Sequence, residues 1–100
     1  MFFIKAVVTK LLDDSVYPEI VLCEFIDYFG KKQVFIEKWP VVSNEKFTKH
    51  FPLKCYIGCK IIKENMNSYL VSTLEPYDIE SEDGLFEFEI SKEMLYEERR

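Results

Sequence analysis

Several residue types that mark particular protein classes are scarce in this chain of 100 residues. Only three glycines and four prolines are present, which excludes collagen-like repeats and long low-complexity segments. No apolar stretch approaches the roughly 18–20 residues that a membrane-spanning helix needs. Lys5 interrupts the apolar N-terminal run, which therefore has neither the order nor the length of a secretory signal peptide. We therefore expect a cytoplasmic protein.

Histidine and cysteine are too few for the common metal and nucleophile motifs. The one histidine, His50, has no cysteine at zinc-ligand spacing, and the three cysteines are Cys23, Cys55 and Cys59. Cys55 and Cys59 lie four strand steps apart, about 13 Å. That distance is too long for a disulfide, whose Cα atoms lie within roughly 7 Å of each other. A thiol on the apolar face of a strand stays protonated and unreactive, so we expect neither a catalytic cysteine nor an enzyme.

Sites that depend on glycine are also missing from the sequence. The three glycines are isolated, so there is no phosphate-binding loop. Residues 78–83 resemble the start of a calcium-binding EF-hand loop, but its sixth position holds Asp83 and Gly84 comes one residue late. We therefore expect no bound metal and no cofactor.

Alternating apolar and polar residues dominate what is present. Phe86, Phe88 and Ile90 alternate with two glutamates, which is typical of a half-buried strand with one face in water. The same period of two predicts about six strands, over residues 2–8, 21–26, 34–39, 55–61, 69–74 and 86–90. Turn-like segments at 28–32 and 65–68 predict hairpins, and 76–84 predicts a longer acidic loop.

Helix signals are short. Ser43-Asn44 can cap a turn over 45–49, and Ser91 can cap a helix over 92–98. The sequence therefore predicts one all-β domain over residues 1–100 with minor α content. We expect a small five- or six-stranded antiparallel barrel or sandwich with a short C-terminal helix.

Negative charge is concentrated in one part of the chain. Residues 1–50 carry seven Lys and seven Asp or Glu, whereas residues 75–98 carry ten acids and one lysine, a local balance of −9. Such a block either keeps an aromatic-rich surface soluble or attracts a basic partner protein. For the second alternative, the candidate contact residues are Tyr77, Asp78, Glu80, Glu82, Asp83, Glu87 and Glu89.

A second hypothesis concerns nucleic acid. Small β-barrels of the OB type bind single strands on exposed aromatic rings flanked by basic residues. The candidate residues for such a platform are Tyr28, Phe29, Lys31, Lys32, Phe35 and Trp39. An overall charge of −5 argues against this binding, because phosphate backbones attract surplus Lys and Arg.

Residues 13–19 (DDSVYPE), 23–27 (CEFID) and 29–32 (FGKK) carry a resemblance that residues 35–41, 79–81 and 86–90 continue over most of the chain. The chain resembles a group of small uncharacterised bacterial proteins, some of which resemble immunity proteins encoded beside secreted toxins. The resemblance implies a cytoplasmic protein that neutralises a cognate toxin by binding it. It implies no particular contact residue, because it consists of core and turn positions.

Overall fold

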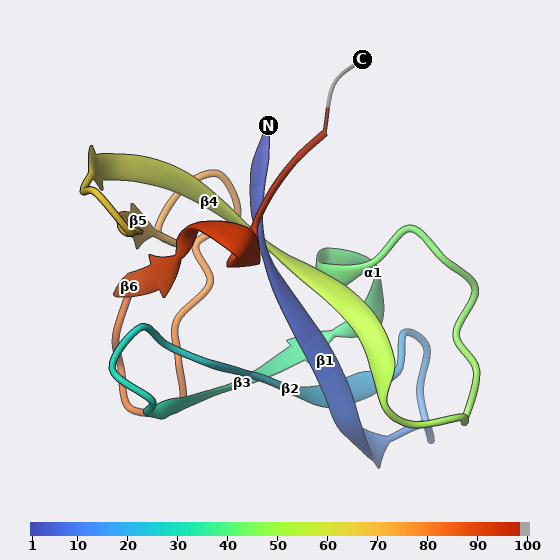
Figure 1. Cartoon of the computed structure of the whole chain (residues 1–100). Helices are drawn as coiled ribbons and strands as arrows, with labels where there is room; N and C mark the ends of the chain where they lie inside the picture. The colour runs from blue at the N-terminus through green and yellow to red at the C-terminus, as the bar shows by residue number, and fades with distance from the viewer. Residues whose placement is uncertain (99–100) are drawn as a thin grey trace.

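The computed structural model describes residues 1–98 of the chain and contains seven antiparallel strands in one strongly curled half-barrel sheet (Figure 1). The strand order is β3-β2-β1-β4-β5-β6, and β7 pairs with β1. The prediction of an all-β protein is confirmed, with seven strands instead of five or six. The elements are β1 (Phe2–Asp13), β2 (Ile20–Ile26), β3 (Lys32–Lys38), α1 (Trp39–Val42), β4 (Leu53–Glu64), β5 (Ser68–Ser72), β6 (Glu87–Ser91), a 3-10 turn (Lys92–Met94) and β7 (Leu95–Glu97).

Two long strands, β1 and β4, cross the middle of the sheet. They pair from Phe2 opposite Cys59 to Val8 opposite Leu53. Over the paired segment the buried residues alternate, with Ile4, Ala6 and Val8 of β1 and Cys55, Ile57 and Cys59 of β4 in the core. Because the side chains of a strand alternate between its two faces, this pairing builds an apolar inner face and an outer face in contact with water.

The core lies inside the curl of the sheet and is rich in aromatic rings. Phe35 is fully buried, and its ring centroid lies 5.8 Å from that of Phe25 and 5.5 Å from that of Phe88. The backbone N–H of Tyr28 donates to the Glu89 carbonyl at 2.8 Å, which joins the β2–β3 hairpin to β6. Strands from the two ends of the sheet are thus joined around one aromatic core.

The side chain of Asp27 organises the β2–β3 hairpin. One carboxylate oxygen accepts the backbone N–H groups of Phe29 and Lys31 at 2.9 Å each, and the other accepts the Gln33 side-chain amide at 3.0 Å. Gly30 takes φ +82°, a conformation that glycine adopts without strain. Burial opposes ionisation of Asp27, but these hydrogen bonds outweigh it and hold the pKa of the carboxyl below its usual value.

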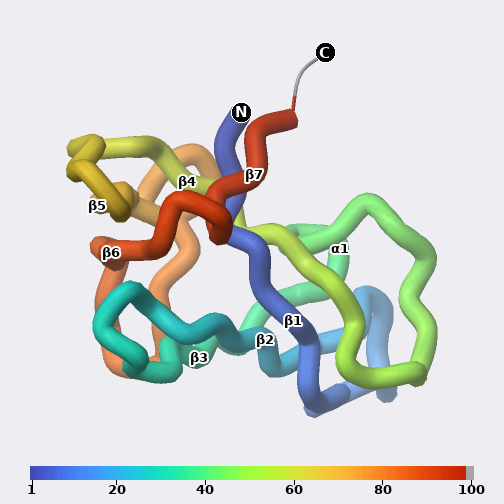
Figure 2. Tube along the Cα trace, in the orientation of Figure 1, coloured from blue at the N-terminus to red at the C-terminus, as the bar shows by residue number. Residues whose placement is uncertain are grey.

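The prediction of a short C-terminal helix was wrong. Residues 92–94 form only a 3-10 turn, after which β7 pairs with the first residues of β1, from Phe2 opposite Glu97 to Ile4 opposite Leu95. Figure 2 shows this segment beside the N-terminus. An open edge of β1 offers backbone partners to Leu95–Glu97, whereas a seven-residue helix in water is marginal.

The helical turn predicted over 45–49 was also misplaced. The only α-helix among residues 1–98 is α1, which begins at Trp39 and ends at Val42. Pro40 lies in its first turn, where a missing N–H costs nothing because that group has no partner within a helix. Residues 43–52 contain no helix and connect α1 to β4.

Candidate protein-binding surface

The acidic loop, residues 73–86, connects β5 to β6 and carries most of the predicted contact residues. Asp78, Glu80, Glu82 and Asp83 are all exposed, as is Glu87 at the start of β6. None of these five carboxylates takes part in an ion pair among residues 1–98. The structure therefore exposes, on one loop and the first residue of β6, five carboxylates that form no ion pair within the described chain.

A buried threonine fixes the first half of the acidic loop. The hydroxyl group of Thr73 donates to the Ile79 carbonyl at 2.5 Å, and the Ile79 N–H donates back to the Thr73 carbonyl at 2.9 Å. Both residues have no exposed surface. The Thr73 N–H also donates to the Phe86 carbonyl at 2.8 Å, so the two ends of the loop are joined. Residues 74–78 thus project from a rigid base.

A buried serine fixes the second half. Ser81 accepts the backbone N–H of Leu85 on its hydroxyl oxygen at 3.0 Å and the N–H of Gly84 on its carbonyl at 2.9 Å. The Glu82 N–H donates to the Val34 carbonyl of β3 at 2.8 Å. The charged side chains of this segment therefore stand on a backbone that is hydrogen-bonded to the sheet.

Asp78 has an unusual backbone conformation and an acidic neighbour. Its φ of +54° lies in the left-handed region, which Asp tolerates better than most residues. Glu37 of β3 is half-buried, and burial raises the pKa of its carboxyl. The negative charge of Asp78 raises the pKa of Glu37 further. Glu37, which the sequence did not single out, thus adds a carboxyl group to this surface.

Apolar side chains accompany these charges. Tyr77 packs over Gly58, because a Cβ at position 58 would lie 2.7 Å from the Tyr77 ring. Tyr77 is nevertheless 48% exposed. Leu74 and Leu85 of the same loop are 52% and 41% exposed. Exposed apolar groups among charged ones match the anatomy of a protein–protein contact, in which apolar anchors lie within a polar rim.

Two acids of the region are already engaged within the protein. Glu89 is half-buried and accepts a hydrogen bond from the Ser68 hydroxyl at 2.7 Å. Glu75 lies 2.5 Å from the Lys60 ammonium group, and this hydrogen bond and ion pair lower the pKa of Glu75. Glu89 therefore contributes less to an open acidic surface than the sequence predicted.

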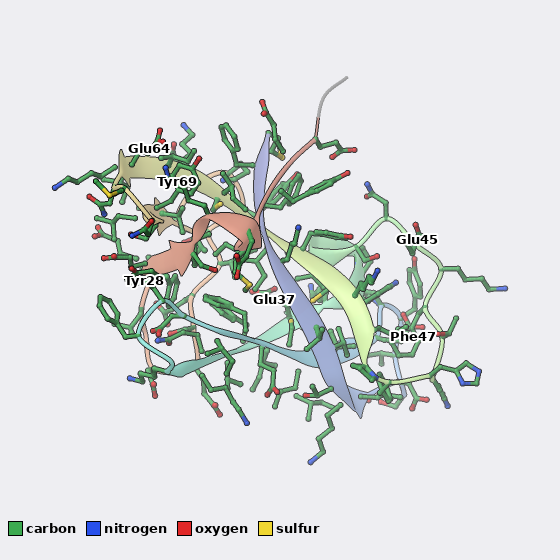
Figure 3. The ribbon with its side chains drawn as sticks, viewed as in Figure 1. Tyr28, Glu37, Glu45, Phe47, Glu64 and Tyr69 are labelled. Carbon is green, nitrogen blue, oxygen red and sulfur yellow. The ribbon has the colours of Figure 1, made fainter. Side chains whose placement is uncertain are left out.

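The predicted nucleic-acid platform is divided by the fold. Tyr28 and Phe29 are exposed at the tip of the β2–β3 hairpin, and Figure 3 shows Tyr28 pointing away from the sheet. Phe35 lies in the core, and Trp39 is 4% exposed, with its indole N–H donating to the Glu45 carbonyl at 2.7 Å. Neither ring can stack on a base in the folded protein, so this part of the prediction was wrong.

The lysines predicted for that platform flank the hairpin tip. Lys31 and Lys32 are both exposed, and the Lys32 ammonium lies 3.8 Å from the Glu24 carboxylate. Two exposed rings and two lysines are what remains of the platform.

Sequence reasoning missed an aromatic cluster on the outer face of the sheet. Tyr56 of β4 contacts both Phe3 of β1 and Tyr96 of β7, with ring centroids 6.4 and 5.0 Å away. The signal was present, because both Phe3 and Tyr56 occupy the polar positions of their alternating strands. The cluster is completed by Tyr96 of β7, a strand that the sequence did not predict.

Groups of residues that could support other chemistry are dispersed. Within residues 1–98, no three His, Cys, Asp or Glu side chains are grouped so that they could hold a metal ion. All three cysteines are buried and free, and His50 is exposed in the segment before β4. Over the same residues, no helix is long and apolar enough to cross a membrane.

No protein-family model, curated protein or solved structure matches this chain.

Proposed function

We propose that this chain is a protein-binding module that acts in the cytoplasm as an immunity-type inhibitor of a basic toxin, such as a nuclease. One observation carries the proposal: Asp78, Glu80, Glu82 and Asp83 stand exposed and without cationic partners on a loop hydrogen-bonded to the sheet. The resemblance to immunity proteins agrees with this assignment but supplies no residue.

Uncompensated charge on a rigid loop favours a cationic partner. Like charges held close together repel, which costs folding free energy, and a basic surface relieves that repulsion. Because the backbone hydrogen bonds already fix residues 73–86, binding requires little further ordering of the loop. The same charges accelerate encounter with a basic protein in a manner that salt weakens.

The proposed mechanism is occlusion. A nuclease lines its substrate site with cationic groups that bind phosphates. The carboxylates of the acidic loop pair with those groups, while Leu74, Tyr77 and Leu85 supply apolar contacts that exclude water. Substrate and inhibitor then compete for one set of cations.

The test uses the protein encoded by the adjoining gene as the partner. The chain should suppress growth inhibition when the two are co-expressed, and the purified pair should bind with an affinity that falls as salt rises. A variant with Asp78→Asn, Glu80→Gln, Glu82→Gln and Asp83→Asn should bind at least tenfold more weakly and lose most of the salt dependence. Asn is chosen at position 78 because it tolerates the left-handed backbone there.

A matched control removes the same amount of charge from other exposed positions. It carries Asp14→Asn, Glu45→Gln, Glu64→Gln and Glu93→Gln, and should bind as the wild type does. Equal losses in both variants would mean that only net charge matters. If the adjoining gene product is neither inhibitory nor bound, the immunity assignment is rejected.

The alternative function is binding of single-stranded nucleic acid, which the exposed Tyr28–Phe29 pair beside Lys31 and Lys32 favours. Trp39 is buried, so its fluorescence is a poor reporter, and anisotropy of a labelled oligonucleotide at low salt is the suitable measurement. Binding that Tyr28→Ala and Phe29→Ala together abolish would favour this alternative over the acidic contact.

A further inference from the structure

A hollow of about 610 Å³ opens where β2 and β7 separate along one edge of β1. The β7 ladder ends at Ile4 opposite Leu95, and the β2 ladder begins at Val7 opposite Glu24. Lys5 and Ala6 therefore have no strand partner on this edge. The gap exists because β4 occupies the other edge of β1 over the same residues, which leaves β2 and β7 to share this one.

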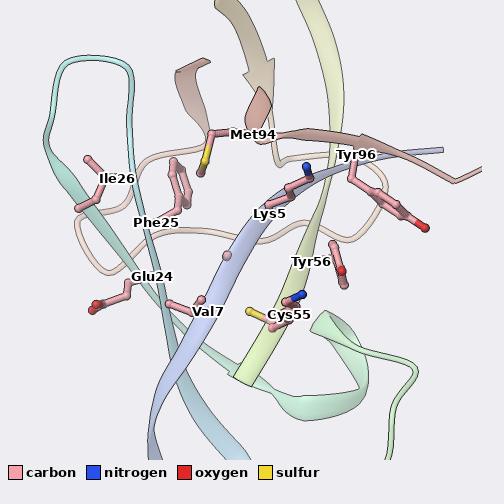
Figure 4. A pocket seen from close by; sticks show the side chains of 11 residues that line it. Lys5, Val7, Glu24, Phe25, Ile26, Cys55, Tyr56, Met94 and Tyr96 are labelled. Carbon is pink, nitrogen blue, oxygen red and sulfur yellow. The ribbon is translucent and has the colours of Figure 1, made fainter. Parts of the chain in front are cut away.

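The lining of the hollow is mainly apolar. Ala6, Phe25 and Cys55 bring buried groups to it, and Met94 of the 3-10 turn faces Phe25 across the gap (Figure 4). Tyr56 and Tyr96, with ring centroids 5.0 Å apart, form an aromatic wall on one side. This size and composition lie within the range of small-molecule sites, about 300–1,000 Å³.

The rim of the hollow is positively charged in a protein whose net charge is −5. Lys5 and Lys54 are both exposed, and neither takes part in an ion pair among residues 1–98. Lys5 pairs with Tyr56 and Lys54 with Val7, so the two lysines are diagonal neighbours on the outer face. The one acid of the rim, Glu24, lies 3.8 Å from the Lys32 ammonium group.

We propose that this hollow binds a small amphipathic anion, with an apolar body against Phe25 and Met94 and an acidic head group between Lys5 and Lys54. Burial of a hydrocarbon chain or ring against the apolar lining is energetically favourable. The unpaired lysines select a negative head over a neutral or positive one, because their charges attract one sign and repel the other. Glu24, which Lys32 partly neutralises, weakens this preference without reversing it.

This site is independent of the proposed toxin contact. Its lining comes from β1, β2, β4 and the C-terminal segment, and it includes no residue of the acidic loop. Loss of toxin binding in the acidic-loop variant would therefore leave ligand binding unchanged, and the two proposals fail separately.

Three ligands with the same ten-carbon chain test the proposal: decanoate, decan-1-ol and decyltrimethylammonium. Each is titrated into the full chain while amide chemical shifts are followed by NMR. Decanoate should bind one to one with a dissociation constant below about 1 mM and at least tenfold more tightly than the cation. The largest shifts should fall at Ala6, Phe25 and Met94.

Charge reversal at the rim completes the test. Lys5→Glu should weaken decanoate binding about tenfold or more, whereas Lys10→Glu, an exposed position elsewhere on β1, should not. Thermal melting checks that both variants are folded. Equal affinity for the three ligands, shifts that map elsewhere, no binding at about 1 mM, or equal effects of the two substitutions would each overturn the proposal.

Discussion

Replacement of Thr73 by Val should loosen the acidic loop and destabilise the whole domain. The substitution keeps the shape of the side chain but removes the hydroxyl group that donates to the Ile79 carbonyl at 2.5 Å. Thr73 and Ile79 have no exposed surface, so water cannot replace the lost donor. A buried carbonyl left without a donor costs about 1–3 kcal/mol.

The expected loss is large enough to measure by thermal unfolding. For a domain of this size, 1 kcal/mol shifts Tm by about 4–8 °C, so a loss of about 2 kcal/mol lowers Tm by about 8–16 °C. Hydrogen exchange gives a local readout, because the Ile79 amide should exchange faster as its contact with residue 73 loosens.

Thr9→Val is the matched control, because Thr9 is an exposed strand residue and the same substitution there should change stability by less than about 0.5 kcal/mol. Thr73→Ser keeps the hydroxyl and should preserve protection of the Ile79 amide. If Thr73→Val melts within about 2 °C of the wild type, with unchanged exchange at Ile79, the hydroxyl does not anchor the loop.

Three further predictions follow from other contacts. Gly58→Ala should displace the Tyr77 ring, because the new Cβ would lie 2.7 Å from it, and should lower the free energy of unfolding by about 1–3 kcal/mol. An unchanged Tm with unshifted Tyr77 resonances would refute this. Burial holds the pKa of the Glu37 carboxyl above its unfolded value, so ionised Glu37 lowers the free energy of unfolding, and this loss grows as pH rises through the folded pKa. In urea unfolding, Glu37→Gln should therefore stabilise the protein at about pH 7 but not at about pH 3. Burial raises the pKa of Cys59 to about 12, and a hydrogen bond with Cys23 together with burial raises the pKa of Cys55. A thiol reagent at about pH 8 should therefore modify Cys55 and Cys59 only as fast as the protein unfolds. Rapid labelling of the native protein would contradict this.

The alternating pattern predicted most of the sheet because its strands are buried on one face. The pattern fails where both faces of a strand are apolar. In β3, Phe35 is fully buried while Ile36 is 48% exposed, and nothing in the sequence alone distinguishes the two. Phe35 was therefore assigned to a surface platform when it belongs to the core. Trp39 was misassigned for a related reason, since its burial depends on the helical turn that begins there.

The two candidate sites also differ in how far the sequence could predict them. A block of acids is visible in any reading of the sequence, and the structure leaves Asp78, Glu80, Glu82 and Asp83 exposed, while their role in binding stays a prediction. The hollow could not be found, because it exists only where β2 and β7 separate, and the segment of β7 reads as helix. Met94 and Leu95 are spaced equally well for a helix or for a turn followed by a strand. The edge of β1 decides between them, and that edge is a tertiary feature.

The pairing of β1 with β7 bears on how the chain folds during synthesis. β1 leaves the ribosome before the other strands of this sheet, yet its pairing is completed last, since its partners include Leu53–Cys59 and Leu95–Glu97. Until those residues are made, one edge of β1 stays unpaired from Phe2 to Val8, and it can capture another nascent chain. The lysines at positions 5 and 10, both exposed on that strand, are the kind of residue that discourages such association. We therefore expect Lys5 to limit association of nascent chains during synthesis, in addition to its proposed role at the rim of the hollow.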